Sequence, residues 1–166
     1  ANDPTIDIRV YPTFRPDAAL GVDDAGHFNS YADKLSEVSG VDCSNLSGFC
    51  DAIRARHNFF HELGGRLSDH GLHHLYDAEC SQKKAENIFD KVRAGTNADA
   101  AQTEAFGAYL MLFFGELDAS HGWTKQLHIG CERNNNRRLF EQLGRDLGCD
   151  SMADVDHVGA VGNYLP

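Results

Sequence analysis

Short segments rich in β-branched residues alternate along this chain with longer segments in which apolar residues recur at helical spacing. This alternation predicts an α/β fold with parallel strands, because a parallel pair needs a crossover that is usually helical. The predicted strands are residues 6–11, residues 123–129 and, between them, residues 66–71, which propensity alone does not separate from a turn. The predicted helices are residues 28–38, 46–63, 81–93, 97–119 and 137–147, with one more short helix within residues 151–166.

Three strands are few for such a fold, since about five or six are usual in a sheet. Three parallel strands would also leave two apolar edges exposed. The 166 residues show no internal repeat or linker, so we expect one segment over residues 1–166. We interpret it as an incomplete α/β layer, either a piece of a larger barrel or a unit that completes itself by association with another copy.

Three of the helices carry specific expectations. Ser81 is placed to cap residues 81–93. Residues 97–119 carry apolar side chains nearly all around the helix, so we expect this helix to be buried on most sides. In residues 137–147, the side chains expected to point inward are Leu139, Phe140, Leu143 and Leu147.

The charge balance excludes some partners. With 15 basic and 25 acidic residues the net charge is −10, which argues against nucleic acid or an anionic membrane as a partner.

The longest apolar run, residues 105–115, is too short to span a bilayer, and residues 1–4 show no signal-peptide pattern. Five cysteines without a CxxC pair favour free thiols and a reducing cytoplasm.

Polar clusters follow the predicted strands, where sites form in parallel α/β folds. They are residues 13–17, residues 68–71 and residues 126–137. Together they supply a guanidinium, a carboxylate, two imidazoles and an amide-rich loop. This combination suits a polar anion such as a sugar acid.

Each candidate residue also has a structural interpretation. Arg15 could clamp a carboxylate through two parallel hydrogen bonds, or pair with Asp17 on the surface. Asp69 could act in the site or cap the turn at Gly71. His128 lies on the opposite strand face from its apolar neighbours and could be functional or structural. The run of asparagines after residue 133 is most simply a loop and a helix cap.

Other histidines give only a weak metal signal. His57 and His61 have i, i+4 spacing but form no HExxH motif, and they read as ordinary helix residues. His70, His73 and His74 cluster near a turn without matching cysteine or carboxylate spacing. We therefore assign no metal ligand within this chain.

Three motifs in one order resemble the uronate isomerase (glucuronate isomerase) family of the amidohydrolase superfamily. They read V-Y-P-T-F-R-P-D at residues 10–17, F-F-H-E-L-G-G-R-L-S-D-H-G-L at residues 59–72, and W-T-K-Q-L-H-I-G-C-E-R-N-N-N from residue 123. The resemblance covers nearly the whole chain, and L-H-I-G-x-x-R-N-N-N is its most specific part. It implies a partial (β/α)8 TIM-barrel segment with about three parallel strands and many helices, from roughly the fourth to the sixth strand.

The resemblance also implies a reaction and roles. The family interconverts D-glucuronate with D-fructuronate, and D-galacturonate with D-tagaturonate, by proton transfer through an enediol. Arg15 would bind the uronate carboxylate, Asp69 and His128 would act near the carbon atoms that exchange a proton, and Arg133 would contact the substrate. The complete enzyme is expected to use a divalent metal, Zn or Mn, and to be a homo-oligomer.

One departure limits the expectation for this chain. Family members carry a metal-binding His-x-His and a late catalytic aspartate, and no His-x-His occurs here. The chain is therefore expected to carry only part of the site. Two alternatives are a metal-dependent hydrolase of the same superfamily, acting on an amide or ester, and a non-catalytic fragment or association module.

Overall fold

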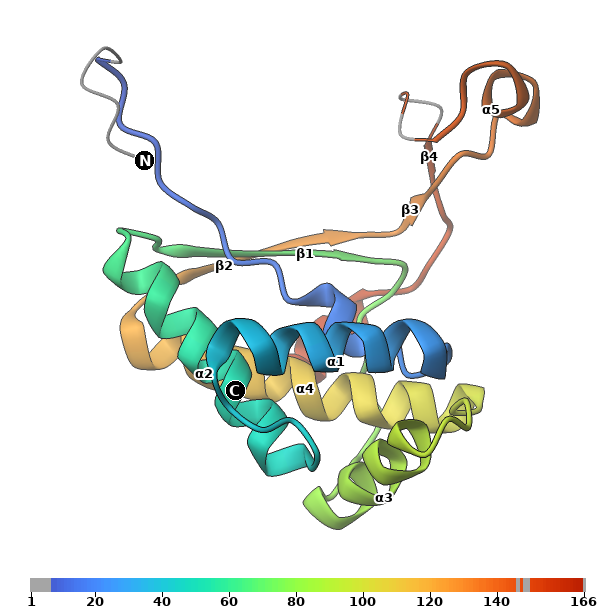
Figure 1. Cartoon of the computed structure of the whole chain (residues 1–166). Helices are drawn as coiled ribbons and strands as arrows, with labels where there is room; N and C mark the ends of the chain where they lie inside the picture. Colours follow the sequence, from blue (N-terminus) through green and yellow to red (C-terminus); the bar gives the residue numbers. More distant parts are fainter. Residues whose placement is uncertain (1–6, 146, 148–149, 166) are drawn as a thin grey trace.

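The computed structural model describes residues 7–145, 147 and 150–165. Four long helices, α1 (Ala25–Ser39), α2 (Leu46–Glu62), α3 (Gln82–Arg93) and α4 (Ala100–His121), lie on one side of a ribbon of two strands (Figure 1). The strands are β1 (Leu67–Leu72) and β2 (Thr124–Ile129). The smaller elements are the 3-10 helix η1 (Asp17–Leu20), the strands β3 (Cys131–Glu132) and β4 (Ser151–Met152), and the helices α5 (Arg137–Leu143) and α6 (Val158–Tyr164).

Capping residues visible in the sequence set the helix ends. Asn45 caps α2 and Ser81 caps α3, the latter as predicted. Asp99 and Gln102 form a reciprocal capping box at the start of α4. Gly122, with a φ of 64°, ends α4 in the left-handed conformation that glycine adopts without strain, and the chain turns directly into β2.

One phenylalanine from each of the four long helices joins a common core. Phe28, Phe49, Phe89 and Phe106 are fully buried, and their ring centroids lie 5.3–6.1 Å apart along the contacts between them. The central part of α4 is buried on most sides as predicted, apart from an exposed strip formed by Leu112, Glu116 and Ala119. This core fixes the helical layer that supports the strands.

The strands β1 and β2 are parallel, paired from Leu67 with Thr124 to Leu72 with Ile129. Phe14 makes a single parallel bridge to Ser68 on the other edge of β1. The described chain thus has the expected helix-rich α/β character with a few parallel segments. The small antiparallel pair β3–β4 was not predicted.

The predicted strand at residues 6–11 is wrong over residues 7–11, while residue 6 lies outside the described part. Among the described residues that precede η1, the backbone pairs with β1 only at Phe14, whose N–H donates to Leu67 O at 3.1 Å and whose oxygen accepts from Asp69 N at 2.9 Å. The β-branched Ile8 and Val10 are 76% and 60% exposed. High β-propensity does not make a strand where no neighbouring strand accepts the ladder.

The helix predicted at residues 137–147 is shorter than expected, and the prediction that its apolar side chains are buried is wrong. Gly144, at a φ of 89°, ends α5 after Leu143. No residue of α5 is buried, and Phe140, Leu143 and Leu147 are all exposed. Figure 1 shows α5 beyond the end of the β1–β2 ribbon, away from the helical layer. The short C-terminal helix is confirmed as α6. No helix in the described ranges is long and apolar enough to cross a bilayer.

The two faces of the β1–β2 ribbon differ completely. In β1, Ser68, His70 and Leu72 are buried toward the helices, whereas Asp69 and Gly71 alternate onto the opposite face. In β2, every second residue, ending at His128, is exposed on that same opposite face. We call this the open face, and the other the helical face.

Candidate functional site

Three predicted site residues meet on the open face. Arg15 Nη1 lies 3.3 Å from Asp69 Oδ2, and His128 Nδ1 lies 2.7 Å from Asp69 Oδ1. The carboxylate of Asp69 therefore sits between a guanidinium and an imidazole. The structure brings these groups together, and their catalytic and binding roles stay predictions.

Strand register explains this arrangement. Asp69 pairs with Gln126 and Gly71 pairs with His128, so Asp69 and His128 are diagonal neighbours on one face. Arg15 comes directly after the bridge at Phe14 and reaches the same face from the other edge of β1.

Asp69 keeps unused capacity to accept hydrogen bonds. Its Oδ1 is buried, and its close contact with His128 is not aligned as a hydrogen bond. The predicted alternative in which Asp69 caps the turn at Gly71 is wrong, because Gly71 N–H donates to Asp17 Oδ2 at 2.8 Å. Because this oxygen is buried beside the imidazole, a ligand hydroxyl can donate a hydrogen bond to it once His128 moves aside.

Asp17 is a site residue that the sequence offered only as a surface partner for Arg15. Arg15 Nε does donate to Asp17 Oδ2, at 3.1 Å, so that pairing is real. Asp17 also lies 2.8 Å from Nδ1 of the buried His70 and accepts from Gly71 N–H. Burial tends to raise the pKa of Asp17, but the hydrogen bonds from His70, Gly71 and Arg15 hold it below its ordinary value.

Arg133 takes a different position from the other three predicted residues. Its Nη1 donates to Asp150 Oδ2 at 2.9 Å, and Asp150 also accepts from Asn134 N–H. The bond from Asn134, with the others it receives, lowers the pKa of Asp150. Arg133 nevertheless lines one open pocket of about 490 Å³ together with Arg15 and His128.

The asparagine run serves the local fold as the simple interpretation predicted. Asn136 caps α5 by accepting from Leu139 N–H at 3.2 Å. Asn134 takes a φ of 56°, a conformation that asparagine tolerates better than most residues. This loop carries Arg133 to the rim of the pocket.

A buried polar network on the helical face was missed by sequence reasoning. Asp118 Oδ1 lies 3.1 Å from His57 Nε2, and Asp118 Oδ2 accepts from Ser68 Oγ at 2.6 Å and from Lys125 Nζ at 2.7 Å. Lys125 Nζ also lies 3.0 Å from His70 Nε2. The available signal was the position of Lys125, which shares a strand face with Leu127 and Ile129.

Burial and opposite charges shift the pKa values in this network. Burial lowers the pKa of Lys125, and contact with Asp118 offsets only part of that shift. Burial tends to raise the pKa of Asp118, but hydrogen bonds from His57, Lys125 and Ser68 leave it lowered. Because the Lys125 ammonium can only donate, His70 Nε2 accepts from it, and His70 Nδ1 carries the proton shared with Asp17.

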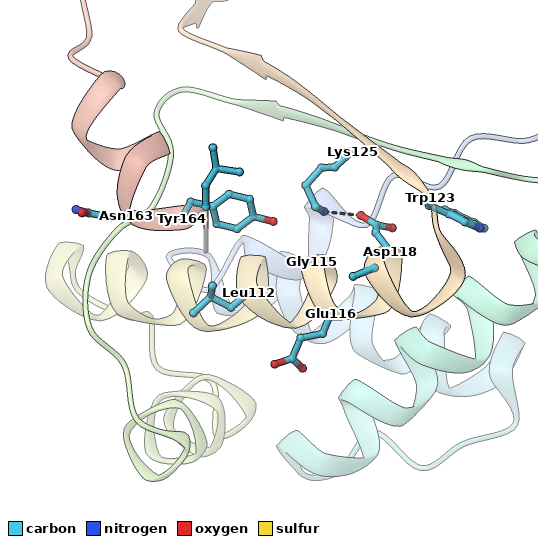
Figure 2. Close-up of a pocket in the computed structure, with 10 residues that line it drawn as sticks. Leu112, Gly115, Glu116, Asp118, Trp123, Lys125, Asn163 and Tyr164 are labelled. Atoms are coloured by element: carbon cyan, nitrogen blue, oxygen red, sulfur yellow. Dashed lines mark ion pairs between the residues drawn. The ribbon is translucent and has the colours of Figure 1, made fainter.

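Figure 2 shows a pocket on the helical face, between α4, α6 and β2. It holds about 520 Å³, with Leu112, Trp123 and Tyr164 among its lining. The ion pair of Lys125 and Asp118 forms part of its polar lining. In this pocket Lys125 and Asp118 form an ion pair with each other. The candidate site lies on the opposite face of the sheet.

The other histidines do not converge on a metal ion. His73 and His74 each pair with a different glutamate, Glu132 at 2.7 Å and Glu104 at 2.5 Å. His61 accepts from Trp123 Nε1 at 3.0 Å. Within the described ranges, no three histidine, cysteine or carboxylate side chains are placed to hold a metal.

Comparison with known proteins gives the family. The family model described as glucuronate isomerase matches residues 1–165. This chain belongs to the glucuronate isomerase family. Uronate isomerases of Solibacter usitatus and Opitutus terrae are 47% and 45% identical to it, over 95% and 96% of this chain. In both cases the match covers 34% of the relative, so the chain spans about a third of their length.

The solved structures agree with the sequence family. The uronate isomerase of Thermotoga maritima superposes with a TM-score of 0.83 at 31% identity, over 93% of this chain and 34% of that one. The glucuronate isomerase of Caulobacter crescentus gives a TM-score of 0.79 at 28% identity, over 93% and 32%. The helix-rich α/β arrangement is therefore that of one part of a uronate isomerase, which is consistent with a partial barrel.

Proposed function

We propose that this chain supplies the carboxylate-binding and acid–base groups of an aldose–ketose isomerase that acts on hexuronates. The substrates would be D-glucuronate, giving D-fructuronate, and D-galacturonate, giving D-tagaturonate. Membership of the glucuronate isomerase family supports the reaction class. The observation that carries the assignment to residues is the meeting of Arg15, Asp69 and His128 on the open face.

Arg15 is suited to bind the uronate carboxylate. A guanidinium offers two parallel N–H donors that match the two oxygens of a carboxylate, which a lysine cannot do. Its Nε is engaged by Asp17 and its Nη1 lies 3.3 Å from Asp69 Oδ2, so the substrate carboxylate would meet the Nη1–Nη2 edge beside Asp69. Fixing this end of the sugar would orient the carbon atoms at the other end.

The isomerisation moves a proton between neighbouring carbons. A proton leaves C2 and another arrives at C1, while the hydroxyl on C2 loses its proton and the oxygen on C1 gains one. His128 can polarise the carbonyl or relay a proton, because an imidazole can donate through one ring nitrogen and accept through the other. Asp69 can orient His128 through Oδ1, which lies 2.7 Å from His128 Nδ1, or accept a proton from a sugar hydroxyl.

The divalent metal that the family resemblance implies finds no ligand set here. In the part of the chain that the structure describes, no three suitable side chains converge. No step of this proposal runs through a metal, and each step above uses this chain's own residues.

Binding of a uronate against its neutral analogue tests the proposal. The ¹⁵N-labelled 166-residue chain is titrated with D-glucuronate and, separately, with D-glucose, while NMR follows the Arg15 guanidinium and the His128 ring. We expect D-glucuronate to shift both sets of signals and D-glucose to leave Arg15 unchanged. Equal responses to the two sugars, or no response to either, would refute the assignment.

A further inference from the structure

The Arg15 guanidinium lies directly over Gly71. A Cβ atom added at Gly71 would come within 2.0 Å of Arg15 Nη2 and 3.3 Å of Arg15 Cζ. The backbone of Gly71 does not have the positive φ that favours glycine, and β1 continues through it. The glycine is therefore required by the guanidinium and not by the conformation of the strand.

Two carboxylates hold the other sides of the same guanidinium. Asp17 Oδ2 accepts from Arg15 Nε at 3.1 Å, and Asp69 Oδ2 lies 3.3 Å from Arg15 Nη1. Asp17 is fixed in turn by the N–H of Gly71 at 2.8 Å. Gly71 thus has two roles. Its backbone N–H donates to Asp17, and its lack of a side chain leaves space for the Arg15 guanidinium.

The support for Asp17 reaches into the core. His70 Nδ1 lies 2.8 Å from Asp17 Oδ1, and the His70 side chain is completely buried. Its ring stacks on Phe114 at a centroid distance of 5.7 Å and an angle of 10°. Nζ of Lys125 lies 3.0 Å from the other ring nitrogen, Nε2. Asp17 is therefore anchored to a rigid layer, although Arg15 itself is half exposed.

We propose that Gly71 and Asp17 are positioning residues, which hold the guanidinium of Arg15 against β1 with its Nη edge directed to the open face. This inference deepens the proposed function and rests on it for the identity of the ligand. Ordering Arg15 before binding means that its side-chain entropy is lost on folding and not on association. The same restraint fixes the angle at which a carboxylate is held, which favours a uronate over a neutral sugar.

The test variant is Gly71→Ala in the 166-residue chain. Because the clash involves the end of a flexible side chain, Arg15 can swing away and the fold is kept. The matched control is Gly162→Ala, since nothing lies within 4 Å of a Cβ at Gly162 and its φ is not positive. Arg15→Lys identifies the Arg15 signal, and Asp17→Asn removes the charged acceptor.

The first readout is the Nε–H signal of Arg15, which exchanges rapidly with water unless it is hydrogen bonded. We expect a protected signal in the wild type and in Gly162→Ala, lost in Gly71→Ala and weakened in Asp17→Asn. Backbone spectra and thermal unfolding should show that Gly71→Ala remains folded. An unprotected signal in the wild type, or an unchanged one in Gly71→Ala, would overturn the inference.

The second readout is the affinity for D-glucuronate relative to D-glucose. Loss of well-placed hydrogen bonds to a charged group weakens binding by roughly 10- to 100-fold, so we expect a loss of this size in D-glucuronate affinity for Gly71→Ala. If Gly71→Ala releases Arg15 while the wild type does not distinguish the two sugars, the positioning stands and the proposed function fails. If D-glucuronate binds Gly71→Ala as tightly as the wild type, the positioning inference fails and the function stands.

Discussion

The two faces of the β1–β2 ribbon both carry charged and imidazole side chains, but they differ in how far these side chains are buried and paired. On the helical face, Asp118 is buried and the Lys125 side chain is 13% exposed, and each makes several polar contacts. On the open face, His128 is half exposed and Asp69 retains an acceptor with no aligned donor. Burial without pairing is costly, and on the helical face Lys125 and Asp118 pair with each other, although His57 Nδ1 is buried there without a hydrogen-bond partner. The open face keeps Asp69 Oδ1 as an acceptor without an aligned donor.

We expect the largest effect, a loss in the free energy of unfolding, from Lys125→Met on the helical face. The substitution leaves Asp118 buried without its ammonium partner, and breaking a buried pair in this way costs about 3–5 kcal/mol. Urea unfolding followed by the fluorescence of Trp123, the single tryptophan, measures the free energy of unfolding. Lys83→Met, at a lysine that is 78% exposed, is the control. Equal losses in the two variants would remove the distinction between the faces.

Arg15→Ala should affect binding and not stability. Hydrogen bonds to a charged group contribute about 1.5–3 kcal/mol, so we expect a loss of that size in the free energy of D-glucuronate binding. Arg54→Ala, at an exposed arginine paired with Asp51 on α2, should leave binding unchanged. Calorimetric titration with D-glucuronate and D-glucose gives both affinities. An Arg15→Ala variant that binds D-glucuronate normally would contradict the role of this residue.

The pH dependence of stability should report Asp17, which links the two faces. The pKa of Asp17 is lowered in the folded chain, so its stabilisation is complete above the unfolded value of about 3.9 and is lost as pH falls through the folded pKa. We expect the free energy of unfolding to decrease from about pH 5 downward. Asp17→Asn should flatten this slope, and the exposed Asp90→Asn should not. An identical slope in Asp17→Asn and the wild type would show that Asp17 is not held as described.

The smallest effect is expected for His128→Gln. The side chain is 54% exposed on the open face, and surface substitutions of this kind change stability by about 0.5 kcal/mol or less. The same variant should lose the ring signals that respond to D-glucuronate. Thermal unfolding of the variant beside the wild type measures the first effect. A large loss of stability would mean that His128 is a structural residue.

The sequence predicted the parts of the site that depend on local rules. Parallel strands place their carboxyl ends at one edge, so Asp69 and His128 could be placed together without coordinates. Arg15 was placed with them after a strand over residues 6–11, and the structure brings it there through the bridge at Phe14 instead. The start of α3 at Ser81 and the extent of β2 followed from capping and propensity. The three motifs also indicated the glucuronate isomerase family, and the comparisons confirm this assignment.

Tertiary structure alone decided where long-range partners exist. Residues 7–11 have strand propensity but no paired neighbour in the described chain, and the apolar side of α5 meets no buried surface. Asp118 and His57 are 61 positions apart, and no local pattern joins them. The requirement for glycine at residue 71 likewise comes from an arginine 56 positions earlier in the sequence. Spacing along the chain encodes periodic faces and caps, whereas pairing across space depends on how the layers pack.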